Sequence, residues 1–412
     1  MSRCLAIRWG TYGDMMYALP ALEQLKQDYG YLHLETTSRG HELLQYHPAF
    51  DRISYAPLEK FPANEWDKLA ESRWGLLQHE LDWDRSVNFW RCLEYSCIPE
   101  EHQEAWHWER EKRREAFGSK NFYDEHWKRA YPELDGSVKP QQSCGTMWFN
   151  DDTAEWMRYF KHKYRDRFII AMPIAGSTGQ KCPTDVLRII GERLEELYPE
   201  ILLVQLGWRE EAHFQFPLVG KERVIHAAHQ YPYLQSLAVC KIADYVVGPE
   251  TSLLVGAGLF GTPKSMLCTA SGYQQATAYH KNDFSLQSLA PCSPCHRAIY
   301  HSKICNVLDS SYGITQACNT HFDITKVLEG AKYAYEMRGL RKTVEKLDGR
   351  SFGTLPDLLA LSVQIPVVGE EVRPIVLERV QAEGGNGPWT EDNEVAMVAS
   401  SESCFVPAES DT

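Results

Sequence analysis

One stretch constrains the fold of this chain more than any other: residues 245–266, YVVGPETSLLVGAGLFGTPKSM. It begins with a short β-prone apolar run, residues 245–247, which Gly248-Pro249 is predicted to stop. Residues 253–260 follow with the pattern of a helix, and a second strand is expected at 264–267. Strand, tight turn, helix and strand in this order predict a βαβ unit of an α/β protein.

The start of the predicted helix is the first candidate site. Glu250, Thr251 and Ser252 offer side-chain oxygens there, and the first backbone N–H groups of a helix have no partner inside it. Such an end attracts anions. A diphosphate site and an ordinary βαβ corner both explain this segment. Gly256 and Gly258 lower the helix propensity, which predicts a close approach to a neighbouring backbone.

The rest of the chain repeats the same alternation of strands and helices. Strands are predicted at residues 4–9, 32–36, 52–55, 86–89, 168–172, 201–206 and 223–226, and helices at 15–30, 41–46, 151–164, 183–198, 233–242 and 324–340. The fold class is α/β, with two doubly wound Rossmann-like domains. Ligands of such domains bind at the carboxyl ends of the strands, here in a cleft between the domains.

The predicted domains are residues 1–150, with a helical tryptophan-rich insertion at about 60–150, and residues 151–345, in which the helix at 324–340 returns toward the first domain. Residues 346–412 are predicted to form an acidic, partly disordered tail.

The loop after the first strand carries a second candidate site. Gly10 and Gly13 form a GxxG pattern that lacks the GxGxxG of dinucleotide-binding folds, which makes a dehydrogenase a weak reading. Asp14 follows this loop, just before the predicted helix. Its carboxylate is either a functional group facing the cleft or the N-cap of the helix.

The insertion leaves several interpretations open. Nine of the twelve tryptophans lie in residues 65–165, and they either stack on sugar rings or form a helical core. The basic residues Arg110, Lys112, Arg113 and Arg114 either grip phosphates of an acceptor or form a solvated helix face paired with glutamates. Asp82-Trp83-Asp84 imitates a DxD metal motif, but without the strand context that this motif needs.

Composition narrows the class of protein. The 412 residues are 43% hydrophobic and 24% charged, with no apolar run of membrane-spanning length and no export signal, so a cytoplasmic protein without a transmembrane segment is expected. The net charge of −13 makes nucleic-acid binding unlikely.

Twelve cysteines in a chain without an export signal indicate reduced thiols. Cys292, Cys295, Cys305 and Cys318 have a spacing that suits a structural zinc or iron site. Unbound or redox-paired thiols remain the alternative, because only one CxxC is present.

Three segments together resemble the heptosyltransferases of lipopolysaccharide assembly, glycosyltransferase family 9, which has the two-domain GT-B fold. They are RWGTYGDMMYALPALEQLK near the start, AGSTGQKCP at residues 175–183 and VVGPETSLLVGAGLFGTP at 246–263. The resemblance implies an inverting transfer of a sugar, heptose-like or other, from a nucleotide-diphosphate sugar to a hydroxyl of a glycan or glycolipid. It also implies that no catalytic metal is needed.

The resemblance assigns roles to single residues. It places Asp14 on the general base, and it implies donor contacts at Gly13, Ser177, Thr178, Lys181, Glu210 (or Glu211), Glu250, Thr251 and Ser252. This chain has Glu250 where the family usually has aspartate, and Val255 where it usually has histidine. A sugar-nucleotide epimerase of the same fold and a non-catalytic nucleotide-sugar binding protein are therefore kept as alternatives, with a nucleic-acid acceptor as a minor one.

Overall fold

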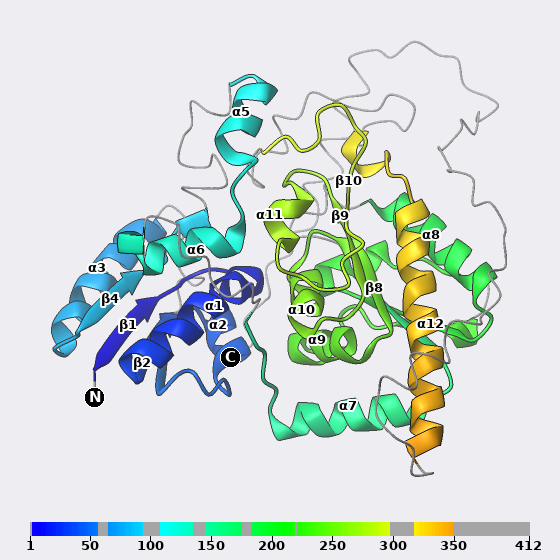
Figure 1. The fold of residues 1–412 in the computed structure, drawn as a ribbon, viewed down its shortest axis with the longest axis horizontal. Helices are drawn as coiled ribbons and strands as arrows, with labels where there is room; N and C mark the ends of the chain where they lie inside the picture. The colour runs from blue at the N-terminus through cyan, green and yellow to red at the C-terminus, as the bar shows by residue number, and fades with distance from the viewer. Residues whose placement is uncertain are drawn as a thin grey trace, which may run out of the picture. The chain divides into compact units, whose positions relative to one another are not determined.

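Two parallel β-sheets flanked by helices make up the described chain (Figure 1). The structure is a computed structural model that describes residues 2–56, 65–93, 108–134, 145–174, 183–218, 221–296 and 317–348. The predicted tail beyond residue 348 lies outside these ranges.

The first sheet has four strands in the order β3-β2-β1-β4. Its parallel pairs place Cys4 opposite both Leu32 of β2 and Arg85 of β4. The elements of this part are β1 (Arg3–Ile7), α1 (Tyr12–Tyr29), β2 (Tyr31–Thr36), α2 (Ser38–Leu44), β3 (Arg52–Tyr55), α3 (Trp66–Glu80), β4 (Arg85–Asn88), α5 (Arg110–Phe117), α6 (Phe122–Ala130) and η4 (Pro132–Leu134).

The second sheet has six strands in the order β10-β9-β8-β5-β6-β7, and all of its pairs are parallel. Its elements are α7 (Asp151–Lys163), β5 (Phe168–Pro173), α8 (Thr184–Leu197), β6 (Ile201–Leu206), η6 (Arg209–Phe214), η7 (Lys221–Arg223), β7 (Val224–His226), α9 (Tyr233–Ile242), β8 (Tyr245–Pro249), α10 (Ser252–Phe260), β9 (Lys264–Cys268), α11 (Tyr273–Thr277), β10 (Leu286–Gln287), η10 (Ala317–Asn319) and α12 (Thr325–Asp348).

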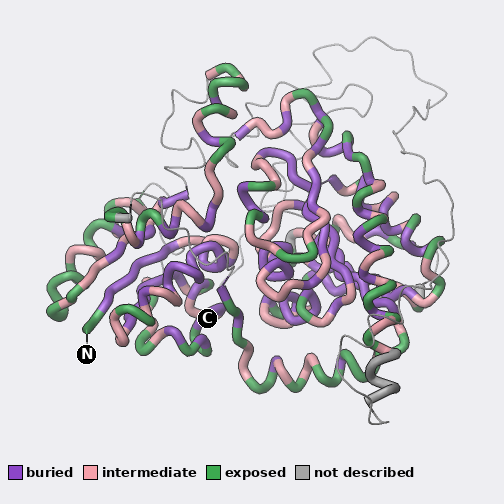
Figure 2. Tube along the Cα trace, viewed as in Figure 1, coloured by how far each residue is buried: buried purple, intermediate pink, exposed green. Residues whose placement is uncertain are grey.

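Successive side chains of a strand point to opposite faces of the sheet, so each sheet contributes to two hydrophobic clusters. In β1, Cys4 and Ala6 point to the face covered by α1 and α6, whereas Leu5 and Ile7 point to the face covered by α3. The α1 and α6 face joins the α9 and α10 face of the second sheet in one continuous core, and the strands form long buried segments (Figure 2). The other face of the second sheet packs on α8 and α12.

The positions of the described tryptophans favour a role in the hydrophobic core over a role in stacking on sugar rings. Four of them, Trp66, Trp74, Trp83 and Trp90, pack against the cluster under α3. Trp127 is buried in the shared core. Helix α3 and strand β4 are regular parts of the first layer, and the predicted bounds of the insertion stay a prediction.

Three predicted details were wrong. β8 continues through Gly248 and Pro249, because Gly248 packs closely against the end of β5. Helix α1 begins at Tyr12, so the second half of the GxxG pattern is helical. Helix α12 was expected to return to the first domain, but it packs on α8, β8 and β9 of the second sheet.

Gly248 provides a test of this packing. A Cβ added there would lie 2.6 Å from the carbonyl oxygen of Pro173, a backbone atom that cannot rotate away. Gly248→Ala should therefore lower the free energy of unfolding by about 1–3 kcal/mol, measured by urea denaturation. Gly75→Ala in α3 is the matched control, because an added Cβ there meets no atom within 4 Å. Equal midpoints for the two variants would contradict the close contact between β8 and β5.

Candidate functional site

Each sheet has a point at which its strand order reverses. In the first sheet β2 and β4 flank β1, and in the second sheet β6 and β8 flank β5. Open α/β sheets bind ligands at the carboxyl ends of strands at such points. Helix α1 starts beside the first of these points and α10 beside the second, so the first turns of the two helices are the candidate site.

Asp14 lies in the first turn of α1. Its Oδ2 accepts hydrogen bonds from the backbone N–H of Thr11, at 2.6 Å, and from the Thr11 hydroxyl, at 2.9 Å. Thr11 is the N-cap, so Asp14 is not the cap residue itself but the carboxylate that closes the cap from the third helical position. Gly10 leaves room for this carboxylate, since an added Cβ would lie 2.7 Å from its Oδ2.

Arg8 holds the other side of the same carboxylate. Its side chain has no exposed surface, and its Nη2 lies 3.1 Å from Asp14 Oδ1, whose side chain is 23% exposed. The Nη1 group donates to the carbonyl oxygens of Trp9 and Phe89, which follow the adjacent strands β1 and β4. A buried guanidinium requires such partners. The sequence analysis did not identify Arg8, although a single charged residue at the end of an apolar strand could have indicated a functional position.

The start of α10 has a different arrangement. Thr251 is the N-cap, and its hydroxyl accepts from the N–H of Leu254 at 3.5 Å. Glu250 turns away from the helix start, because its Oε1 accepts from the backbone N–H groups of Thr269, at 2.5 Å, and Ala270, at 3.2 Å. The carboxylate therefore ties the end of β8 to the loop after β9.

The two helix starts meet. The first turns of α1 and α10 pack side by side, and a Cβ added to Gly13 would lie 3.6 Å from Cβ of Ser252, an ordinary van der Waals distance. Next to this contact the rings of Tyr12 and Tyr233 stack with centroids 3.5 Å apart. Burial raises the pKa of Tyr17 well above its ordinary value, and the charges of Cys268, Glu250 and Asp14 act in the same direction.

Five predicted site residues are therefore gathered around the contact between α1 and α10: Gly13, Asp14, Glu250, Thr251 and Ser252. Ser177, Thr178 and Lys181 lie outside the described residues, as does the side chain of Glu210. The neighbouring Glu211 caps its own 3-10 turn, because its Oε2 accepts from the N–H of Trp208 at 2.7 Å.

The predicted basic cluster on α5 contacts the second half of the chain. Arg113 Nε donates to the carbonyl oxygen of Cys295 at 2.8 Å, and Arg114 Nε donates to that of Pro294 at 3.1 Å. Arg110 donates to the carbonyl oxygen of Pro291. Arg110 also pairs with Glu111, as the interpretation of a solvated helix face expects. Arg113 and Arg114 fit neither interpretation, since their side chains donate to backbone carbonyl oxygens.

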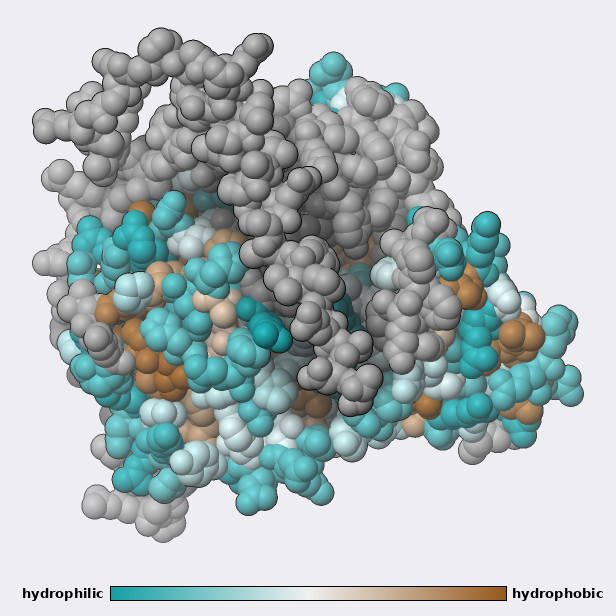
Figure 3. All heavy atoms as spheres, turned by 180° about the vertical axis from the view of Figure 1, so that it is seen from behind, coloured by the Kyte–Doolittle hydropathy of each residue, from teal (hydrophilic) through white to brown (hydrophobic). Residues whose placement is uncertain are grey.

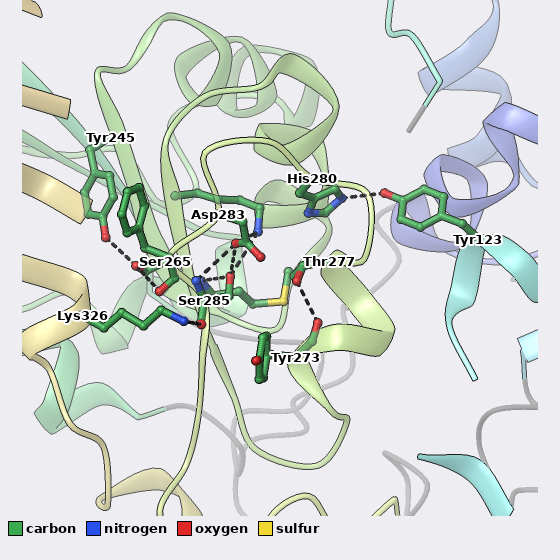
Figure 4. A network of polar contacts seen from close by, with 12 residues as sticks. Tyr123, Tyr245, Ser265, Tyr273, Thr277, His280, Asp283, Ser285 and Lys326 are labelled. Atoms are coloured by element: carbon green, nitrogen blue, oxygen red, sulfur yellow. Dashed lines mark hydrogen bonds and ion pairs between the residues drawn. The ribbon is translucent and has the colours of Figure 1, made fainter. Parts of the chain in front are cut away.

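A buried network of polar side chains beside α6 also connects the first half of the chain to the second half (Figure 4). The Tyr123 hydroxyl lies 2.6 Å from Nε2 of His280, and Lys264 pairs with Asp283 at 2.8 Å. Burial lowers the pKa of His280 well below its ordinary value, and the positive charge of Lys264 lowers it further. His280 is thus a neutral hydrogen-bonding group at neutral pH.

Two sequence motifs were considered for metal binding, the DxD-like residues 82–84 and the four cysteines. Asp84 Oδ2 accepts from the N–H of Arg3 at 2.7 Å, so this aspartate of the DxD-like motif caps the start of β1. Within the described residues, no group of three or more His, Cys, Asp and Glu side chains could hold a metal ion, so Cys292, Cys295 and Cys318 do not form such a group. Cys305 lies outside these ranges, and the four-cysteine site stays a prediction.

The arrangement of the two sheets matches that of solved glycosyltransferase structures. The chain is similar to the glycosyl transferase family 9 protein from Veillonella parvula DSM 2008, at 12% identity and a TM-score of 0.56, covering 81% of this chain and 97% of that one. It is also similar to the Escherichia coli ADP-heptose lipopolysaccharide heptosyltransferase II, at 12% identity and a TM-score of 0.49, covering 70% and 91% of the two chains. A third similar structure is the E. coli heptosyltransferase WaaC with ADP, at 14% identity and a TM-score of 0.44, covering 69% and 92%.

The likeness to the family 9 protein from Veillonella parvula establishes the fold. The predicted pair of Rossmann-like α/β domains is confirmed, and so is the resemblance to family 9 at the level of the fold. No family model and no curated protein matches the sequence. None of the described helices is both long enough and apolar enough to span a membrane.

The cysteine hypothesis has a direct measurement. If the four thiols bind one zinc or iron ion, elemental analysis of the purified protein should find about one equivalent, and Cys295→Ser should lower both the metal content and the melting temperature. Cys92→Ser is a control, since Cys92 is buried near Glu125, away from the motif. Metal-free protein with an unchanged melting temperature would contradict the hypothesis.

Proposed function

We propose that this protein is an inverting glycosyltransferase that moves a sugar from a nucleotide-diphosphate sugar to a hydroxyl group of a glycan or glycolipid. The observation that carries the proposal is the contact between the first turns of α1 and α10, at Gly13 and Ser252. The first turn of α1, which carries Asp14, thereby packs against the helix start that is suited to a diphosphate. The fold of the family 9 protein from Veillonella parvula supports the same class of reaction.

The start of α10 supplies the donor side. Its first backbone N–H groups and the positive end of the helix dipole favour a diphosphate, and Thr251 caps the helix without adding charge. Glu250 is bound to the N–H groups of Thr269 and Ala270, so its oxygen does not occupy the helix start. When the bond between the anomeric carbon and the phosphate oxygen breaks, its electron pair stays on the diphosphate, and the helix start stabilises the added charge.

Asp14 supplies the acceptor side. As the acceptor oxygen forms its bond to the anomeric carbon, its proton passes to the Asp14 carboxylate. Oδ2 is engaged by Thr11 and Oδ1 by Arg8, so the orientation of the carboxylate is set before any substrate binds. The contribution of this carboxylate depends on its position and on its negative charge opposite the forming oxocarbenium ion.

The same contacts favour one alternative, a non-catalytic nucleotide-sugar binding protein. A carboxylate that closes a helix cap and neutralises buried Arg8 has a structural role that needs no reaction.

The Asp14→Asn variant distinguishes a glycosyltransferase from a non-catalytic binding protein. The amide keeps the shape but cannot take the proton, so the rate of transfer should fall by a factor on the order of 10² to 10⁴. Stability should fall as well, by about 1–3 kcal/mol, because buried Arg8 loses its charged partner. The donor for the assay comes from a thermal-shift screen of ADP-, UDP- and GDP-sugars, and released nucleoside diphosphate is measured with a panel of glycan acceptors.

Thr11→Ala is the control for this experiment. It removes the N-cap side chain at a cost of about 1 kcal/mol but keeps the carboxylate, so it should retain most of the activity. If both variants lose stability while both keep their turnover, Asp14 is a structural residue and the catalytic role is excluded.

Thr251→Asp tests the donor side. Aspartate caps helices as well as threonine does, but it places a negative charge where the phosphates are expected. Nucleoside diphosphate affinity, measured by calorimetry, should fall about tenfold or more, whereas the neutral cap in Thr251→Asn should leave it nearly unchanged. Equal affinities of the two variants would show that the diphosphate binds elsewhere.

A further inference from the structure

An exposed aromatic ring stands at the carboxyl edge of the second sheet. Trp208 follows β6 after a single glycine, and 53% of its surface is exposed. Sequence reasoning assigned it no role. Exposed apolar side chains are common on proteins, and on the face drawn in Figure 3 hydrophobic residues lie in small groups bordered by hydrophilic ones. Exposure alone therefore gives Trp208 no function.

The backbone that carries this ring is held firmly. The N–H of Trp208 donates to Glu211 Oε2 at 2.7 Å, and the preceding carbonyl, of Gly207, accepts from the N–H of His229 at 3.1 Å. His229 is exposed and has a φ of 69°, a left-handed conformation that is unfavourable for a residue with a side chain. Two exposed rings thus sit on adjoining, well-anchored loops after β6 and β7.

The register of the sheet fixes where this edge lies relative to α10. Leu206 of β6 pairs with Pro173 of β5, and Ala171 of β5 pairs with Val246 of β8. The ends of β6 and β8 are therefore two strand spacings apart, about 10 Å. A nucleoside diphosphate spans such a distance between its outer phosphate and its base.

We propose that Trp208 is the stacking surface for the nucleobase of the donor, with the diphosphate at the start of α10. This inference rests on the proposed function and adds to it a residue that contacts the base. A base has a π-face whatever its identity, so stacking on Trp208 strengthens the binding of adenine and uracil nucleotides alike. Selection between bases then comes from other contacts.

The test is calorimetric titration of the full chain with ADP, UDP and inorganic pyrophosphate. Trp208→Ala should weaken both nucleotides about tenfold, because stacking of a base on an aromatic ring contributes on the order of 1–3 kcal/mol. Pyrophosphate, which has no base, should bind the variant and the wild type equally. Trp208→Phe should restore most of the nucleotide affinity.

Trp148→Ala is the matched control, since Trp148 is 51% exposed but lies in the segment before α7. It should leave all three titrations unchanged. If the wild type binds nucleotides and Trp208→Ala binds them equally well, the stacking role is wrong while the donor site stands. A loss of pyrophosphate binding as large as that of ADP would also overturn the stacking role. If the wild type binds neither ADP nor UDP, and no GDP-sugar in the donor screen, the proposed function itself fails.

Discussion

The packing of α1 against α10 is the contact on which the rest of the described structure depends. It joins the hydrophobic layers of the two sheets into one core, because the sides of α1 and α10 that face away from their own sheets are buried against each other. Gly13 of α1 faces Ser252 of α10 in this contact. Gly256 of α10 is required to be small, because an added Cβ would lie 2.2 Å from Leu237 and 3.6 Å from Met16. The glycines of α10 were expected to admit a neighbouring backbone, but Gly256 and Gly258 instead admit the side chains of Leu237 and His280.

Asp14 has a structural role in addition to the catalytic role proposed for it. Its carboxylate closes the cap of α1 and neutralises the guanidinium of Arg8, which lies at the ends of β1 and β4. Both tasks hold the carboxylate in a single orientation at the edge of the sheet. A catalytic carboxylate needs this positional control, because most of its effect is lost when it moves by about 1 Å. Structural contacts of this kind are therefore compatible with a catalytic role.

The alternation of strands and helices could be predicted, because each buried strand is a short apolar run and each helix shows its own period. β3, β6 and α9 have the predicted bounds. The start of α1 could not be placed, since glycine, threonine and tyrosine before Asp14 resemble a loop until the cap bonds are known. The contact of Gly13 with Ser252 depends on how two sheets pack, which local periodicity does not contain. Trp208 was missed because its exposure follows from the tertiary structure alone.

Helix α5 has a consequence for the order in which the chain acquires its structure. It has only eight residues, and its arginines donate to carbonyl oxygens of residues about 180 positions later in the chain. A helix this short is marginal in water on its own. During synthesis α5 leaves the ribosome long before Pro294 and Cys295 exist, so at a rate of about 5–20 residues per second its acceptors are absent for roughly ten seconds or more. The first half of the chain must therefore remain locally incomplete until the second half arrives, and a chain truncated before residue 290 would leave these guanidinium groups without their acceptors.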